Sequence, residues 1–480
     1  MGGSGKLEVT QDEAAPVWSF RRYLALARSW IPRLASDSLL RNSFFIMATT
    51  VASSGLGYIY WTAAARVFPT AAVGLASALI SAVNLVTVLS IFGLQAAVID
   101  LLPAQRTSRS WSVMVDAALA VVAISGVIFG AGMWLLLPVL GPNLQLAGGG
   151  AVEALLLISL VVVWNVTTVL DGIFMADRVA HYMFARNVVF SAVKIPLLLL
   201  PLLLPLFHRS AVTILLSWIL ATVVSLILSL FWFLPRLGYR LMKSIGERGR
   251  QARVLGTRIV GNHLSRLGGA LPMYLLPVIV ATRLSASDSA YLYTTWMVGT
   301  IFFMISSSIS SALWAEGSAD RGALTARVRK SAYLIGVCLV PIGGAFLLWG
   351  RLVLEVFGPS YATHGAVLLS ILVFAAVPDA ITNLAVSVWR VRGHLYAAAM
   401  LNLGMSAVTL ILAWFLVPTV GVAGAGWSWL IGQSCGSIVV LASLLMRGGR
   451  GKIARLVSPN GGGEKPLGIP MSRGIEPEAD

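Results

Sequence analysis

Charged residues are scarce in this chain. They make up 11% of its 480 residues, whereas 58% are Ala, Val, Ile, Leu, Met, Phe, Trp, Tyr or Cys. A soluble globular protein carries about 25% charged residues, and its folded surface needs polar groups to face water. The shortage of charge excludes a large soluble domain and indicates an integral membrane protein.

Residues typical of catalytic or metal sites are also rare. The two cysteines, Cys338 and Cys435, both lie inside apolar runs, so neither a disulfide framework nor a cysteine metal site is expected. Carboxylate pairs, nucleotide-binding loops and His/Cys clusters are missing from the segments between the apolar runs. We therefore expect a protein that is not an enzyme, hydrolyses no ATP and uses neither metal nor cofactor.

Acidic residues are fewer than basic ones. Thirty-five Lys and Arg against nineteen Asp and Glu give a net charge of +16. Such an excess suits either nucleic acid or anionic lipid as a partner. No soluble domain remains to present a nucleic-acid surface, so the sequence predicts contact with membrane lipids and no nucleic acid.

The apolar runs predict twelve helices that each cross the membrane, since a span needs about 20 mostly apolar residues. Their expected positions are 42–65, 71–98, 112–137, 151–173, 185–207, 211–234, 256–281, 289–313, 331–349, 364–387, 395–416 and 421–446. With this division, 29 Lys and Arg fall on the side of the N-terminus and 4 on the other side. The positive-inside rule then places both termini in the cytoplasm.

The longest connection between spans falls near the middle of the chain and divides it into two halves. We expect an N-lobe of spans 1–6 (42–234), a basic cytoplasmic linker (235–255) and a C-lobe of spans 7–12 (256–446). The first 41 residues form a cytoplasmic tail in which 17–40 reads as an interfacial amphipathic helix, the alternative being a solvated basic tail. Residues 447–480 are expected to be a basic, disordered cytoplasmic tail.

The two halves repeat each other. ARVFPTAAVGLAS after span 1 aligns with ATRLSASDSAYLY after span 7, which pairs Gly74 with Ala290. FMADRVAHYMFARN between spans 4 and 5 aligns with VWRVRGHLYAAAMLN between spans 10 and 11, which pairs Arg178 with Arg392. The offsets, 216 and 214, are nearly equal. Both halves begin on the same side, so a parallel repeat around a central cavity is expected.

Polar residues inside the spans mark the candidate site. Arg258, Asn262 and Arg266 recur every four residues on span 7 and so share one helix face. Arg266, together with Lys194 on span 5, is expected near mid-membrane. Two cations at that depth without an obvious acid predict an anion-binding site. The alternatives are that Arg266 pairs with Asp379 or reaches the lipid headgroups.

Other polar residues have two interpretations each. Asp379 on span 10 is either a site that couples transport to a proton or cation, or a structural partner of a basic residue. Asn84 and Asn383, like Asn262, either line the cavity or form hydrogen bonds between helices.

Residues 41–103 resemble the start of the polysaccharide transporter family, a branch of the multidrug/oligosaccharidyl-lipid/polysaccharide exporter superfamily. The likeness rests on the A-R-x-F turn at Ala65–Phe68, on V-G-L at Val73–Leu75 and on G-L-x-x-A-x-I from Gly93 to Ile99. WRVRGHLYAAAMLNLGMSAVTLILAWFLVPTVGVAGAGWSWLIGQ resembles the family's last three spans. Two departures concern the lipid II branch: its two extra C-terminal spans and its Arg-acid pair on the first helix are missing.

The resemblance implies an all-α multi-pass protein of about twelve transmembrane helices, in two six-helix lobes around a central cationic cavity. It implies a flippase in the bacterial plasma membrane that moves a polyprenyl-diphosphate-linked oligosaccharide outward by alternating access. Arg66, in the turn after span 1, joins Arg258, Arg266 and Lys194 as an implied diphosphate ligand. Polysaccharide polymerases and glycosyltransferases are the implied protein partners. The rival functions are a multidrug antiporter of the same superfamily and a membrane glycosyltransferase or polymerase.

Overall fold

The computed structural model is built from helices alone in the part of the chain that it describes. These residues are 38–105, 107–140, 144–146, 150–204, 208–240, 245–257, 260–319 and 324–457. Apolar helices satisfy every backbone hydrogen bond within one segment, which is what a chain in lipid requires. The expected amphipathic helix at 17–40 lies almost entirely outside the described residues.

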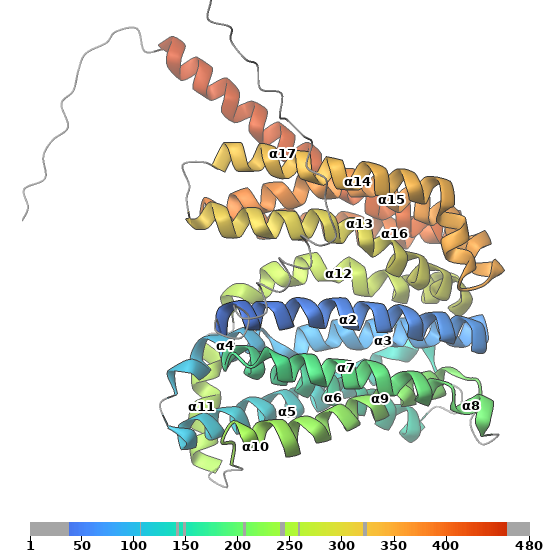
Figure 1. The fold of residues 1–480 in the computed structure, drawn as a ribbon. Coiled ribbons are helices and arrows are strands. Elements are labelled where there is room, and N and C mark those ends of the chain that lie inside the picture. Colours follow the sequence, from blue (N-terminus) through green and yellow to red (C-terminus); the bar gives the residue numbers. More distant parts are fainter. Residues whose placement is uncertain are drawn as a thin grey trace, which may run out of the picture.

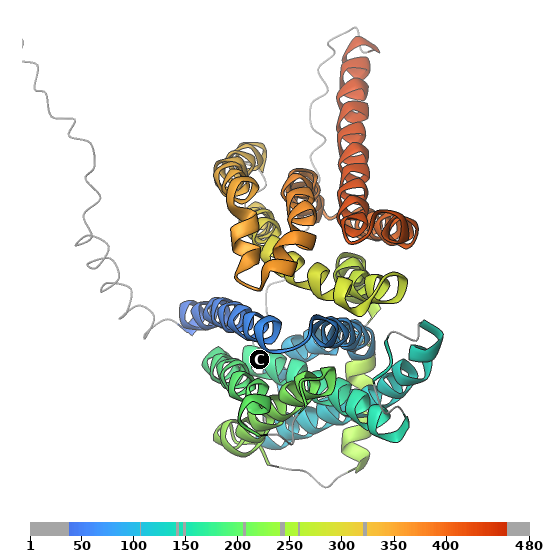
Figure 2. The same ribbon diagram turned by 90° about the vertical axis from the view of Figure 1, so that its right-hand side faces the viewer.

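The first six predicted spans form one helical bundle, the N-lobe (Figures 1 and 2). Its elements are α2 (Ser38–Val67), α3 (Thr70–Ile91), α4 (Leu94–Leu101), η1 (Leu102–Ala104), α5 (Ser108–Leu140), α6 (Gly150–Ala176), α7 (Ala180–Leu198), α8 (Leu200–Leu203), α9 (Ala211–Leu228), the π-helical turn η3 (Ser229–Phe233) and α10 (Leu234–Arg236).

The other six spans form a second bundle, the C-lobe, which Figure 2 shows above the first. Its elements are α12 (Val260–Arg283), α13 (Ala286–Ala319), α14 (Leu324–Glu355), α15 (Pro359–Val391), α16 (Leu395–Val420) and α17 (Ala423–Val457). The expected tail from 447 thus begins inside α17, and residues from 458 onward lie outside the described part.

Each of the twelve predicted spans is therefore helical in the described part of the chain. Ten helices of the described part are long and apolar enough to cross a membrane. The other two are α2, with 30 residues, and α12, whose stretch Gly268–Arg283 is apolar but shorter. The predicted fold class, an all-α membrane protein of two six-helix lobes, is confirmed.

The second span differs from the single helix expected over 71–98. It is broken at Phe92 and Gly93, whose φ angles of 49° and 81° are both left-handed. Two left-handed residues in succession stop α3 and start α4 in a new direction. Gly adopts such angles readily, whereas a large side chain like that of Phe92 rarely does.

The ends of the bundle differ in how the lobes meet. The end with the α2–α3 turn at Phe68 and the α14–α15 turn at Phe357 is called here the Phe68 end. The end with the α6–α7 turn at Asp177 and the α15–α16 turn at Gly393 is called the Asp177 end. In Figure 1 the Phe68 end, which includes α8, lies on the right.

Both lobes contribute to one hydrophobic core toward the Phe68 end, which includes Tyr60, Phe68 and Leu79 with Phe302 and Phe357. Toward the Asp177 end the buried clusters divide. One belongs to the N-lobe and the linker, and others belong to α13–α17 alone. The lobes are therefore joined by apolar packing at the Phe68 end.

The expected linker contains a helix, α11 (Ile245–Thr257), that crosses the Asp177 end of the N-lobe (Figure 1). Leu255 of α11 is buried in the N-lobe cluster. An Arg109 amino group of α5 lies 2.9 Å from a Glu247 carboxylate oxygen of α11. The linker is thus packed against the N-lobe.

Candidate functional site

Lys194 lies inside the N-lobe, on α7. Its side chain is 4% exposed. The ammonium lies 4.8 Å from the ring centre of Tyr60, 4.7 Å from that of Phe190 and 4.9 Å from that of Trp218. We call these three rings the aromatic box. Cation–π attraction holds the charge there, so a diphosphate could contact Lys194 only if α2, α7 and α9 move apart.

Arg66 lies in the last turn of α2, at the Phe68 end, and is exposed. Its Nε and Nη2 donate hydrogen bonds of 2.8 Å to the carbonyl oxygens of Val356 and Glu355. These acceptors lie at the C-terminal end of α14, in the other lobe. Arg66 therefore joins the two lobes through main-chain acceptors.

Three further contacts close the Phe68 end beside Arg66. The rings of Tyr58 and Phe357 lie 5.1 Å apart, and those of Trp61 and Tyr293 lie 4.7 Å apart. At Gly74 the backbones of α3 and α13 touch, because an added Cβ would overlap the Ala286 carbonyl. In this structure the lobes are shut at this end.

Asp379 and Asn383 lie together in the C-lobe, on α15. Asp379 is 6% exposed, and its Oδ2 accepts hydrogen bonds from Ser306 Oγ at 2.5 Å and Asn383 Nδ2 at 2.9 Å. A cavity of about 140 Å³ adjoins them, lined also by Gly269, Thr382, Asn402, Met405, Ser406, Thr409, Trp429 and Gln433. The carboxylate thus has hydroxyl and amide partners and faces a small polar cavity.

The predicted polar face of span 7 is partly outside the described residues. Arg258 lies in the undescribed gap before α12, and the side chains of Asn262 and Arg266 are likewise outside the described part. The backbone of α12 is helical from Val260 onward. Position 266 is therefore one turn before Ala270 and two turns before Tyr274, on one face of the helix.

Ala270 and Tyr274 line a cavity between the lobes. We call it the inter-lobe cavity; its volume is about 210 Å³. Its other lining residues come from the N-lobe: Thr87, Val88, Ile91, Gly93, Gln95 and Thr168. None of these described residues is charged. Asn84, three residues before Thr87 on α3, is half-buried and is not among them.

Sequence patterns did not single out Thr87, Gln95, Thr168 or Tyr274. One signal was available, because Tyr274 continues the four-residue spacing of Arg258, Asn262 and Arg266. The Phe92–Gly93 break that brings Gln95 to the cavity had no clear sequence signal except the glycine itself.

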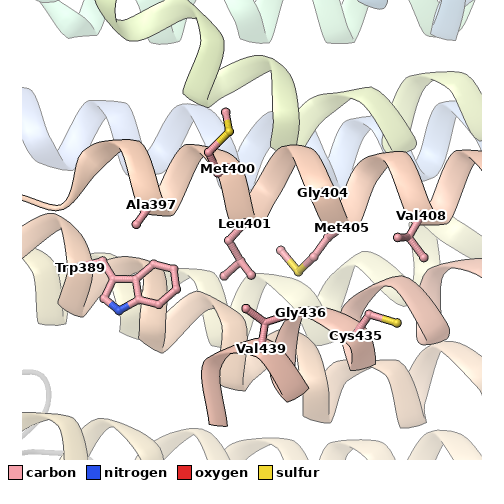
Figure 3. A pocket seen from close by; sticks show the side chains of 10 residues that line it. All are labelled: Trp389, Ala397, Met400, Leu401, Gly404, Met405, Val408, Cys435, Gly436 and Val439. Atoms are coloured by element: carbon pink, nitrogen blue, oxygen red, sulfur yellow. The ribbon is translucent and has the colours of Figure 1, made fainter. Parts of the chain in front are cut away.

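An apolar groove of about 470 Å³ lies between α16 and α17 (Figure 3). Leu401 and Met405 of α16 point toward α17, whose Cys435 and Val439 also line the groove, and Trp389 lies at one end (Figure 3). Met405 also borders the polar cavity beside Asp379. The groove suits hydrocarbon and offers little to a saccharide.

No family model and no curated protein matches this sequence. Solved structures do resemble it. The lipid II flippase MurJ in an inward closed conformation matches with a TM-score of 0.63 at 12% identity, over 84% of this chain and 87% of that one. An inward-facing multidrug resistance MATE family transporter of the MOP superfamily gives 0.61 at 17% identity, over 86% and 98%. An outward-facing MATE family transporter matches with a TM-score of 0.52 at 17% identity, over 85% of this chain and 95% of that one.

These matches extend over most of both chains, and the structures matched are transporters rather than enzymes. At 12% to 17% identity they establish the fold alone. The chain has the two-lobe, twelve-helix fold that lipid II flippase MurJ and MATE multidrug transporters share.

Proposed function

We propose that this chain is a flippase in the bacterial plasma membrane, with both termini in the cytoplasm. Its cargo is a polyprenyl-diphosphate-linked oligosaccharide, which it moves from the inner to the outer leaflet for the assembly of a cell-surface polysaccharide. Glycosyltransferases that build the cargo and a polymerase that consumes it are the proposed protein partners.

The register of α12 is the observation that carries this proposal. The face that bears Ala270 and Tyr274 lines the inter-lobe cavity, and positions 258, 262 and 266 precede them at four-residue spacing. Positions 262 and 266 of α12 therefore belong to the same face as the cavity lining, and Arg258 precedes them in the sequence at the same four-residue spacing. A cationic face that leads into a cavity whose described lining has no carboxylate favours an anionic cargo over a cationic one.

The contacts between lobes support an inward-facing state. The shared core and the Arg66 hydrogen bonds close the Phe68 end. Since basic residues are in excess at the other end, the positive-inside rule makes the Phe68 end the external one. Cargo would then enter from the Asp177 end and bind through its diphosphate to Arg266 and Arg258. Rocking of the lobes would open the Phe68 end, where Arg66 releases its carbonyl partners and becomes available to the diphosphate.

The membrane potential can drive this export. Two negative charges moved out of a negative interior gain about 4.6 kcal/mol per 100 mV. Asp379 supplies a second source of free energy for export. A buried carboxylate beside a polar cavity can bind a proton or cation, which would enter the cell as the cargo leaves. In the proposed cycle, Lys194 contacts the diphosphate only if the aromatic box opens.

Asp379 is also the observation that favours the second candidate, a multidrug or cation antiporter. Its carboxylate is a buried anion inside a lobe, and the fold is common to MATE transporters. This function would place the organic cation near Asp379 and leave Arg266 without effect on transport.

The deciding experiment uses proteoliposomes that contain a fluorescent polyprenyl-diphosphate saccharide and a membrane-impermeant quencher. We expect the wild-type protein to equilibrate the lipid between leaflets, Arg266→Ala to abolish this, and Arg266→Lys to retain part of it. Asp379→Asn separates the energy sources: it stops transport driven by a proton gradient and spares transport driven by potential. Failure of the wild-type protein under both gradients, with uptake of cationic dyes instead, would assign the antiporter function.

A further inference from the structure

The inter-lobe cavity contains an uncharged polar patch that the diphosphate site does not use. Its polar lining consists of Thr87 from α3, Gln95 from α4, Thr168 from α6 and Tyr274 from α12. Valine, isoleucine and alanine side chains fill the spaces between them. The volume, about 210 Å³, is several times the ~30 Å³ that one water occupies in the liquid.

The break in the second span positions one of these groups. Phe92 and Gly93 turn the chain so that Gln95 lies in the first turn of α4, beside the cavity. On α6, Gly172 makes room for it, since a Cβ at that position would lie 2.8 Å from Gln95 Cγ. Thr168 lies one turn before Gly172 on the same face. Strained backbone of this kind is concentrated at functional sites.

Thr87 provides an independent sign of a ligand. Its side chain is 5% exposed, it lines the cavity, and its hydroxyl has no hydrogen-bond partner in the structure. A buried hydroxyl without a partner is unfavourable, so rotation of the Thr87 side chain toward a cargo group in the cavity would gain a hydrogen bond. In contrast, the hydroxyl of Thr168 donates to the Trp164 carbonyl at 2.9 Å and keeps its lone pairs for an acceptor role.

We infer that the inter-lobe cavity binds the first sugar of the cargo, the residue bonded directly to the diphosphate. This inference rests on the proposed function. Hydroxyl and amide groups separated by apolar side chains match a sugar ring, which presents hydroxyl groups around a carbon framework. Position 266 lies four residues, about 6 Å along the helix axis, from Ala270. A diphosphate at Arg266 would therefore carry its first sugar into this cavity.

Short-chain analogues test the inference with the full-length chain in lipid nanodiscs. The probes are farnesyl diphosphate and its conjugates with glucose, galactose, N-acetylglucosamine or N-acetylgalactosamine, and calorimetry measures their affinities. At least one conjugate should bind more tightly than farnesyl diphosphate. The affinity for that conjugate should fall by about three- to tenfold in each of the variants Thr87→Val, Gln95→Leu and Thr168→Val. The affinity for farnesyl diphosphate should stay unchanged. Thr87→Ser should restore the affinity.

Thr167→Val is the matched control. This residue is the neighbour of Thr168, its hydroxyl donates to Trp164 at 2.8 Å, and it is not part of the cavity lining. This substitution should leave the affinity for every probe unchanged. A wild-type protein that binds all five probes within twofold of one another overturns the sugar assignment, while farnesyl diphosphate binding that depends on Arg266 still supports the flippase. A protein that binds no probe overturns both.

Discussion

Gly74 of α3 and Ala290 of α13 meet where the two lobes touch. A Cβ added to Gly74 would lie 2.9 Å from the amide nitrogen of Ala290 and would overlap the Ala286 carbonyl oxygen. The sequence repeat pairs these same two residues, and equivalent residues of two halves can touch only near the axis that relates the halves. The predicted repeat would therefore have its pseudo-twofold axis close to Gly74.

Gly74→Val should prevent the Phe68 end from closing, because the added side chain has no room against α13. We expect a shift toward a state open at that end. Phe357→Cys, placed in a protein whose Cys338 and Cys435 are replaced by Ser, reports it: a maleimide should label this buried position much faster when Gly74→Val is present.

The control for this prediction is Gly57→Val on α2, where an added Cβ meets no atom within 4 Å. It should leave labelling at Phe357→Cys unchanged. Equal labelling in all three proteins would mean that α13 yields at Gly74 and that this contact does not hold the lobes together.

Arg66→Gln should make the Phe68 end open more readily. The change removes two hydrogen bonds of a charged donor to the Glu355 and Val356 carbonyls. Since Arg66 is exposed, we expect labelling at Tyr58→Cys to accelerate by only about three- to tenfold. Arg209→Gln, another exposed arginine expected at this end, is the comparison. If both variants label alike, the Arg66 hydrogen bonds do not restrain opening.

Lys194→Met should leave the protein at least as stable as the wild type. The ammonium gains about 0.5–2 kcal/mol from a ring contact, whereas burial of a charge costs several kcal/mol. Methionine keeps most of the volume among Tyr60, Phe190 and Trp218. Thermal unfolding in detergent measures the change, with Lys194→Ala as the variant that leaves a void. A stability loss for Lys194→Met as large as that for Lys194→Ala would contradict this.

Asp177 should make stability depend on pH. Burial raises the pKa of its carboxyl above the ordinary 3.8, and the hydrogen bond from the Trp111 indole offsets part of that rise. A carboxyl with a higher pKa in the folded than in the unfolded state binds protons preferentially when folded. The free energy of unfolding therefore falls as pH rises through these two values.

Asp177→Asn removes this ionisation and keeps an acceptor for Trp111. We expect the variant to be more stable than the wild type at neutral pH and the difference to shrink toward acidic pH, as measured by thermal unfolding across a pH series. A constant difference at every pH would show that ionisation of Asp177 is not its source.

The number and positions of the spans were predictable from hydropathy, because lipid admits only long apolar helices here. The direction of each side chain was not. Spans that are apolar all round have little periodicity to show which face is buried. The depth of Lys194 could therefore be estimated, but its enclosure by the aromatic box could not.

Long-range partners set the rest of the site. Arg66 bonds to carbonyl groups almost 300 residues away, and main-chain acceptors leave no mark in a sequence. The break at Phe92 is a backbone state that a bulky residue adopts only when its surroundings impose it. The α6–α7 and α15–α16 turns repeat a left-handed residue at Arg178 and Gly393, within one position of the predicted pairing.

The core shared by both lobes has a consequence for a transporter of the proposed kind. Opening the Phe68 end exposes apolar surface that is buried here, so the empty protein rests in the closed form. The protein then opens outward mainly when cargo is bound, because the bound headgroup offsets the cost of exposing that surface. The rate of transport would follow the concentration of finished cargo, and the transporter without cargo would not make the membrane leaky.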